Sequence, residues 1–368
     1  MKIGILTYHQ AQNYGALWQA IALRHVLSKL GNDVFFIDYV PEYRKRMYKL
    51  CDINQFLSST WKKQIKYCIR FLPYIWRKFV FHAFINKYIY KYCQTINDRF
   101  DCIIYGSDQI WRKQPYIEDY DSMYFGQNTI GTSSHISYAA SLDTLPEEEE
   151  DIKRFCSLLK NIDRISVREK QTQMFLVQHG FRNVHFCLDP TFLINKAQWE
   201  QLVSPRRIIH KRYILLFDLL ADCGVKAFNC DDVRNFAKRN NAIVIKLRAN
   251  LHCTESLQGR LFESPEDFIN LIRYAECVLT SSYHGLVFSV IMKRPVYCCF
   301  PTSNSRMESL MSVLQMQDRI IAPENPILPP SVEPIDFTII EERIDAYRNS
   351  SLQYLQSIVK AEIDTNEE

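Results

Sequence analysis

The chain has 368 residues, of which 47% are hydrophobic, and a formal net charge of +4. This length and apolar content can fill two ordinary domains, which is the number we expect. So small a net charge excludes a surface that is basic throughout, and any preference for anionic partners must come from local clusters.

The cysteines and the N-terminus both indicate a cytoplasmic protein. Twelve cysteines occur, but none has a C-x-x-C spacing. We therefore expect no zinc site, no other metal and no disulfide framework, and interpret the cysteines as small apolar residues that stay reduced. The N-terminal MKIGILTYHQ has too short an apolar segment for a signal peptide, and no run approaches the ~18 apolar residues of a membrane-spanning helix.

The first elements have the pattern of a Rossmann-like domain. A strand is predicted at Lys2–Leu6, a helix at Ala16–Leu30 and a second strand at Val34–Tyr39. The loop between the first strand and the helix lacks G-x-G-x-x-G, so a dinucleotide site is not indicated. Its residues Asn13 and Tyr14 lie at the carboxyl end of the strand, where they either face a ligand or form a turn that caps the helix.

Residues 43–92 form a basic segment with interleaved aromatic residues. Twelve Lys and Arg residues occur there against the single acid Asp52, and Trp61, Trp76 and Phe79 are among the aromatics. We interpret this as a helical insertion, at about 43–97, that rests on an anionic membrane surface. Nucleic acid is the alternative partner, but we favour the membrane over it. The structural alternative is a solvated basic face whose aromatic residues pack inward.

Two further strand ends carry candidate residues. The strand Phe100–Tyr105 runs into Gly-Ser-Asp-Gln, where Asp108 either faces the ligand or caps a helix. Strands are also predicted at Ile136–Ala140 and Arg164–Val167, and Arg168 follows the latter directly. An arginine there can bind a phosphate or carboxylate through two hydrogen bonds, or pair with Glu169.

The second half repeats the alternation of strands and helices. After a strand at Val184–Leu188 and a crossing linker at Asn195–Arg207, strands are predicted at Tyr213–Phe217 and Ile243–Leu247, with a helix at Asp231–Arg239 between them. This alternation indicates an α/β fold with parallel sheets in both halves.

The segment Cys277–Phe300 is a strand, a hydroxyl-rich turn, an apolar helix and another strand. Ser281, Ser282 and His284 lie at the start of the helix, where free backbone N–H groups and an imidazole favour an anion. The structural alternative is a serine N-cap with a histidine that satisfies a buried polar group. Arg306 lies at the next strand-to-helix junction, and a terminal helix is predicted at Ile339–Val359.

An ordered set of motifs resembles the polysaccharide pyruvyl transferase family. The motifs are TYHQAQNYGALWQA, YGSDQIWR, ISYAASL, ISVREKQ, LDPTFLI, TSSYHGLVFSVIMKRPVYCCF and SNSRMESLMSVLQMQDR. The resemblance implies a GT-B-like fold in which two Rossmann-like domains face each other across a cleft. We assign residues 1–195 to the N-terminal, acceptor-side domain, 206–335 to the donor-side domain and 336–368 to a terminal helix and tail.

The resemblance implies transfer of the enolpyruvyl unit of phosphoenolpyruvate onto two hydroxyls of a hexose, which forms a pyruvate ketal and releases phosphate. His284 would then be the catalytic acid or base, and Arg168, Ser281, Ser282 and Arg306 would bind the donor. Asp108 would take a hydroxyl proton. Asn13 and Tyr14 would orient the sugar. Ser282 replaces an arginine that is common in the family, so a donor-binding charge is missing from this turn.

The expected partners are phosphoenolpyruvate and a sugar acceptor, which the resemblance implies to be a lipid-linked oligosaccharide of capsular or exopolysaccharide synthesis, with no cofactor and no metal. This places the protein in the cytoplasm, peripheral to the inner face of the membrane. Two alternatives stay open. One is a GT-B sugar-nucleotide glycosyltransferase, although no acid occurs between Tyr283 and Met307 to hold a ribose. The other is a non-catalytic, glycan-binding member of the family.

Overall fold

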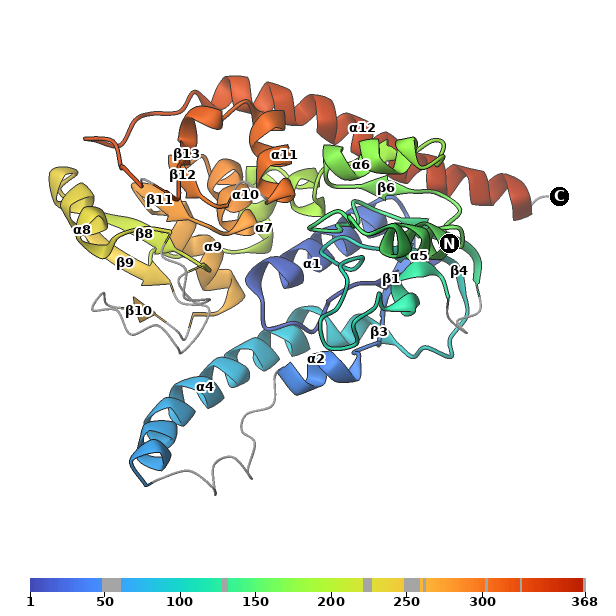
Figure 1. Cartoon of the computed structure of the whole chain (residues 1–368), viewed down its shortest axis with the longest axis horizontal. Coiled ribbons are helices and arrows are strands. Elements are labelled where there is room, and N and C mark those ends of the chain that lie inside the picture. The colour runs from blue at the N-terminus through green and yellow to red at the C-terminus, as the bar shows by residue number, and fades with distance from the viewer. Residues whose placement is uncertain are drawn as a thin grey trace.

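The computed structural model describes residues 1–47, 61–127, 132–220, 227–247, 259–260, 263–301, 304–324 and 326–366. Two parallel sheets lie side by side, each covered by helices (Figure 1). The protein is thus α/β with two Rossmann-like halves, a GT-B-like architecture, and the fold class expected from the alternating pattern is confirmed.

The first sheet has the strand order β3-β2-β1-β4-β5, with all pairs parallel. Isolated bridges from Ile136 and Ala140 extend it toward the two-stranded pair β6-β7. The strands are β1 (Lys2–Leu6), β2 (Asp33–Ile37), β3 (Cys93–Gln94), β4 (Phe100–Tyr105), β5 (Thr132–Ser137), β6 (Ser166–Val167) and β7 (His185–Phe186). The strand predicted at Ile136–Ala140 ends earlier, at Ser137, because the chain leaves the extended conformation at Ala139, whose φ is +47°.

The second sheet has the order β10-β9-β8-β11-β12-β13, again parallel throughout. Its central strand β8 begins at Tyr213 as predicted and is buried along its whole length, which is what a sheet covered on both faces requires. The strands are β8 (Tyr213–Phe217), β9 (Ile243–Leu247), β10 (Gly259–Arg260), β11 (Cys277–Thr280), β12 (Val296–Cys299) and β13 (Ile320–Ile321).

The helices follow the strands at their carboxyl ends. In the first half they are α1 (Tyr14–Lys29), α2 (Glu42–Met47), α4 (Trp61–Tyr88), η1 (Tyr90–Tyr92), η2 (Ser122–Phe125), α5 (Glu149–Leu159) and α6 (Lys170–Gln178). In the second half they are α8 (Cys230–Arg239), α9 (Pro265–Arg273), α10 (Tyr283–Ile291), α11 (Ser305–Leu314), η5 (Gln317–Arg319) and α12 (Phe337–Asn366).

Two short helices connect the halves, η3 (Pro190–Leu193) and α7 (Lys196–Leu202). The segment Asn195–Arg207 was expected only as a crossing linker, but its first half is helix α7. Asn195 and Gln198 cap that helix reciprocally, and Trp199 is fully buried between Trp18 of α1 and Phe288 of α10. The apolar core therefore continues from one half to the other through the connection.

Helix α12 returns from the second half to the first and runs along both (Figure 1). Near its start, Lys293 pairs with Glu341 at 2.8 Å and Arg343 donates to the carbonyl of Leu314. Further along, the hydroxyl of Tyr354 donates to the carbonyl of Ser137 in the first sheet. The helix therefore ties the two halves together a second time.

The basic insertion includes α2 and α4, and its middle, residues 48–60, lies outside the described residues. Helix α4 projects from the body of the molecule (Figure 1). Among the aromatic residues of α4 whose side chains are described, Phe81 and Phe84 are buried, whereas Trp76 is 54% and Phe79 is 63% exposed. Inward packing therefore accounts for only some of the aromatics of this segment.

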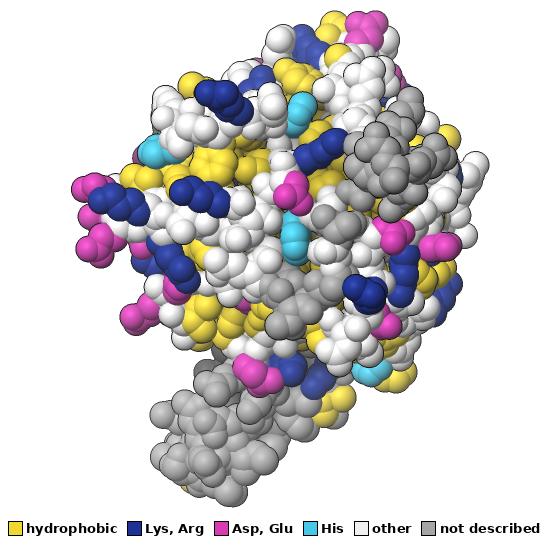
Figure 2. Space-filling view, turned by 90° about the vertical axis from the view of Figure 1, so that its right-hand side faces the viewer, with side chains coloured by type: hydrophobic (Ala, Val, Ile, Leu, Met, Phe, Trp, Pro, Cys, Tyr) yellow, Lys and Arg dark blue, Asp and Glu magenta, His cyan; other side chains and the backbone are white. Residues whose placement is uncertain are grey.

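Charged side chains on the face at the right-hand side of Figure 1 do not form one basic surface. Figure 2 shows Lys and Arg interspersed with Asp and Glu over the described part of this face. Among the helices within the described ranges, none is both long and apolar enough to cross a bilayer.

Candidate functional site

The imidazole of His284 lies against the start of α1, at the contact between the two halves. A Cβ atom built on Gly15 would be 1.9 Å from Nδ1 of His284 and 2.2 Å from Cγ, so only a glycine allows this approach. The side chain of His284 is 11% exposed. The ring that the sequence singled out is therefore enclosed by the other half of the chain.

The turn before α10 sets the position of His284. Ser282 is the N-cap, and its hydroxyl accepts a hydrogen bond from the backbone N–H of Gly285 at 3.4 Å. Ser281 donates to a carboxylate oxygen of Asp218 at 2.7 Å and accepts from the N–H of Leu219 at 2.8 Å. Both serines, predicted to bind the donor, are thus engaged within the turn and hold its shape.

Asp189 is the carboxylate at the centre of the site. Its side chain is fully buried and accepts hydrogen bonds from Nη1 of Arg168 at 2.6 Å and from the hydroxyl of Thr191 at 2.7 Å. Nε2 of His284 lies 3.5 Å from Oδ2, which is long for a hydrogen bond. Burial alone would raise the pKa of the Asp189 carboxyl, but His284, Arg168 and Thr191 together hold that pKa well below its usual range.

Arg168 is buried beside Asp189, with 2% of its side chain exposed. Its guanidinium lies over the ring of Tyr283, 4.4 Å from the centroid, and its Nε is 3.5 Å from Glu169. Burial raises the pKa of the Glu169 carboxyl, which also accepts a hydrogen bond from Ser141 at 2.6 Å. The charge of Arg168 is thus largely compensated, as in the alternative that paired it with Glu169, and Asp189 is a second partner.

Two donor atoms of this cluster are left without partners. Within the described part of the chain, neither Nη2 of Arg168 nor Nε2 of His284 has a hydrogen-bond partner, although both are buried. Buried donors in proteins are nearly always satisfied by protein, water or ligand. The two atoms are therefore available to donate hydrogen bonds to an acceptor oxygen of a ligand.

Arg306 and Asp108 lie at the edge of the cluster. Nε of Arg306 is 2.8 Å from Oδ1 of Asp143, so this arginine is also neutralised by a carboxylate. Asp108 is half-buried, has a φ of +68° and accepts a hydrogen bond from the N–H of Gln109. Burial lowers the pKa of Arg168, but the neighbouring Tyr283, Asp189 and Glu169 raise it above its usual value. The charge of Asp108 adds a smaller effect in the same direction.

The two residues expected to orient a sugar have other contacts. Asn13 is exposed and caps α1 by accepting from the N–H groups of Gly15 and Ala16. Tyr14 is 3% exposed, stacks on Phe268 with ring centroids 4.8 Å apart, and donates to the carbonyl of Glu263. The turn-and-cap alternative describes Asn13 correctly, and Tyr14 joins the halves rather than presenting a face to a ligand in this arrangement.

Sequence reasoning assigned no chemical role to Asp189 or Gly15, and considered Glu169 only as an alternative partner of Arg168. Asp189 directly follows the strand predicted at Val184–Leu188 and lies within the motif LDPTFLI. Its place at the carboxyl end of a strand, where ligands bind, was therefore visible in the sequence. Gly15 was visible only as a loop glycine, because its partner ring is in the other half of the chain. Among the described residues, no group of three or more His, Cys, Asp and Glu side chains is placed to hold a metal ion.

Comparisons with known proteins give one family and several distant structures. The family model described as polysaccharide pyruvyl transferase matches residues 13–304. No curated protein matches the chain significantly. A putative UDP-N-acetylglucosamine 2-epimerase from Listeria monocytogenes superposes with a TM-score of 0.49 at 10% identity, covering 99% of this chain and 97% of the other. The UDP-GlcNAc 2-epimerase from Neisseria meningitidis bound to UDP-GlcNAc gives 0.46 at 11% identity, with 99% and 100% covered.

Proposed function

Because this chain belongs to the polysaccharide pyruvyl transferase family, we propose that it transfers the enolpyruvyl group of phosphoenolpyruvate onto two hydroxyls of a hexose. The product is a cyclic pyruvate ketal, and phosphate is released. The observation that supports this proposal is the buried cluster of Arg168, His284 and Asp189 at the contact between the halves, with two unpartnered donor atoms.

His284 is the acid in this proposal. C2 of the donor becomes electrophilic when its methylene carbon receives a proton, and a histidine can supply one near neutral pH. Asp189, which stays ionised, orients the ring. One sugar hydroxyl then adds to C2, phosphate leaves, and the second hydroxyl closes the ring. The two hydroxyl protons are lost to the phosphate and to a base, for which Asp108 is our candidate.

Donor binding in this proposal uses the groups that the cluster leaves free. Nη2 of Arg168 and the N–H groups of the first turn of α10 favour an anionic oxygen. Arg306 joins them by exchanging Asp143 for the donor. Since the side chains of His284 and Arg168 are only 11% and 2% exposed, the halves must part for the donor to enter and then close around it.

The decisive test is a direct assay. We expect the wild-type protein, incubated with phosphoenolpyruvate and a panel of hexosides, to release phosphate and add the mass of a pyruvate ketal to one of the sugars. The variant His284→Gln should form the ketal at least ~100-fold more slowly, which is the usual size of a general-acid contribution. The control variant His210→Gln, at an exposed position, should keep the wild-type rate. Sugar binding without any ketal, in wild type as in variant, would support the non-catalytic alternative instead.

Membrane association is the second part of the proposal, because a lipid-linked acceptor would be presented at a bilayer surface. The supporting observation is the exposed group on α4: Ile75, Trp76 and Phe79 are 39%, 54% and 63% exposed, within the most basic stretch of the sequence. Exposed aromatics beside cations are typical of interfacial helices. This would make the protein peripheral at the cytoplasmic face of the membrane.

Sedimentation with liposomes tests the membrane proposal. We expect the protein to sediment with vesicles that contain anionic lipid and to stay in solution with neutral ones. Changing Trp76 and Phe79 to serine should reduce the bound fraction several-fold, whereas changing Tyr116, which is 64% exposed elsewhere, should not. Equal binding to both kinds of vesicle, or none to either, would contradict the proposal.

A further inference from the structure

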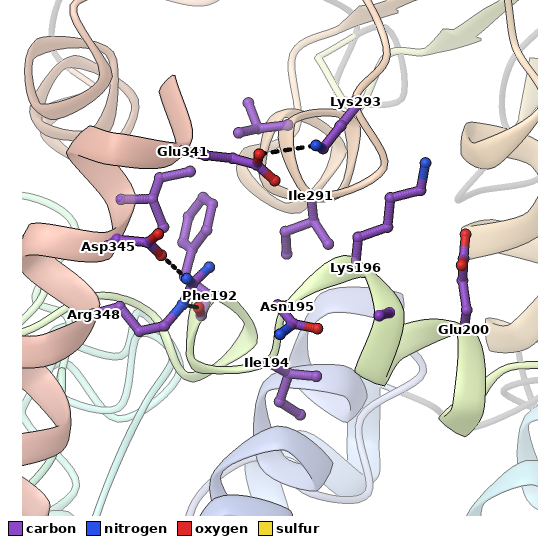
Figure 3. Close-up of a pocket in the computed structure, with 13 residues that line it drawn as sticks. Phe192, Ile194, Asn195, Lys196, Glu200, Ile291, Lys293, Glu341, Asp345 and Arg348 are labelled. Atoms are coloured by element: carbon purple, nitrogen blue, oxygen red, sulfur yellow. Dashed lines mark hydrogen bonds and ion pairs between the residues drawn. The ribbon is translucent and has the colours of Figure 1, made fainter. Parts of the chain in front are cut away.

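A pocket of about 520 Å³ lies at the end of α10 opposite to His284 (Figure 3). This volume is within the ~300–1,000 Å³ that is usual for small-molecule sites. The lining comes from η3 and α7, from the last turn of α10 and the residues after it, and from the first half of α12. Two of the motifs supply part of this lining, Phe192 and Ile194 from LDPTFLI and Val290, Ile291 and Lys293 from TSSYHGLVFSVIMKRPVYCCF, but none of these residues has been given a ligand-binding role above.

The position of the pocket is unusual because both connections between the halves form its walls. Residues 192–200 lead from the first sheet to the second, and α12 makes the return. Glu341 is tied to Lys293 of the second half at 2.8 Å, whereas Nε of Arg348 donates to the carbonyl of Phe192 at 2.7 Å. A rotation of one half against the other would change the shape of this pocket.

The pocket has an apolar floor and a charged rim. Phe192, Ile194 and Ile344 are buried and supply the floor, together with Ile291 at the end of α10. Of the rim cations, Lys293 and Arg348 pair with acids of α12.

Lys196 is the remaining cation of the rim. Within the described residues it has no ion-pair partner, and Figure 3 shows it extending away from the paired side chains of α12. The lining also contains Glu200, four positions after Lys196 in α7, whose Oε1 lies 4.0 Å from Nε of Arg273. Among the cations of this rim, Lys196 is thus the one for which the described residues supply no ion pair, and it lies beside an apolar surface.

We propose that this pocket is an effector site for a small amphiphilic anion, and that its occupation sets the orientation of the two halves. The apolar body of the ligand lies on the floor, and its single carboxylate, sulfonate or phosphate pairs with Lys196. Helix α10 transmits the effect, because Ile291 is part of the floor while His284 in the first turn of the same helix contacts Gly15. This inference does not depend on the reaction that the site carries out.

Binding is tested with 8-anilinonaphthalene-1-sulfonate, which combines an aromatic body with one sulfonate. Titration should give saturable binding that Lys196→Glu weakens at least tenfold and that Ala197→Trp, which fills the pocket from its exposed rim, abolishes. The matched controls are Lys211→Glu and Ala346→Trp, both at exposed positions outside the pocket. Binding that neither pocket variant changes would overturn the site.

Coupling is tested by the reactivity of His284 toward diethylpyrocarbonate, followed by peptide mass mapping. Saturating probe should change the rate of modification at His284 at least threefold and leave the exposed His210 unchanged. In Ala197→Trp the probe should have no effect on either histidine. A bound probe that leaves the rate at His284 unaltered would refute the coupling, whether or not the protein forms ketals.

Discussion

Replacing Gly15 by alanine is expected to abolish catalysis without unfolding the protein. The added Cβ would lie 1.9 Å from Nδ1 and 2.2 Å from Cγ of His284, and a rigid imidazole cannot absorb such an overlap. Either the ring turns away from Asp189 or the halves separate. Since a displacement of about 1 Å at a reacting group can cost ~10²-fold, we expect at least that loss in ketal formation, with ~1–3 kcal/mol lost in the free energy of unfolding from overpacking.

Two further variants separate this steric effect from a general one. A Cβ added to Gly31 would meet nothing within 4 Å, and the φ of this residue is +86°, so Gly31→Ala should cost only the ~1 kcal/mol of backbone strain and keep full activity. In a His284→Ala background the overlap disappears, so Gly15→Ala should then cost almost no stability. Urea unfolding of the four proteins of this cycle checks the claim, and additive costs would show that the contact does not exist.

Changing Asp189 to asparagine is expected to give the largest loss of stability. The substitution removes the carboxylate that lies 2.6 Å from Nη1 of Arg168, whose side chain is only 2% exposed. The remaining acid beside this guanidinium is Glu169, and burial raises the pKa of its carboxyl. Breaking one partner of a buried ion pair costs ~3–5 kcal/mol. The comparison is Asp151→Asn, which removes a surface pair with Lys113 and should lower the free energy of unfolding far less.

The pH dependence of unfolding gives this prediction a second measurement. Because the folded-state pKa of Asp189 lies below its unfolded value, its stabilisation is present above the ordinary aspartate pKa of ~3.9 and is lost as the pH falls toward the folded-state value. Wild-type protein should therefore lose unfolding free energy between about pH 4 and pH 2 more steeply than Asp189→Asn. Equal slopes in the two proteins would mean that Asp189 is not held ionised by its neighbours.

The local sequence determined the elements and the order in which they alternate. Apolar runs such as Tyr213–Phe217 are buried on both faces of a sheet, so their composition alone identifies them as central parallel strands. Caps also depend on a few neighbouring residues, which is why the start of α10 at Ser282 follows from the sequence. The ordered motifs were enough to indicate the family.

Only the tertiary structure decided what each candidate side chain does. Whether Arg168 is a free cation or a neutralised one depends on Asp189, 21 positions away, and the approach of Gly15 to His284 joins residues from opposite halves of the chain. Charge compensation and close contact are properties of distance in space, and the spacing along the chain carries no information about them until the two halves are packed. For the same reason, the pocket between the two connections was invisible in the sequence.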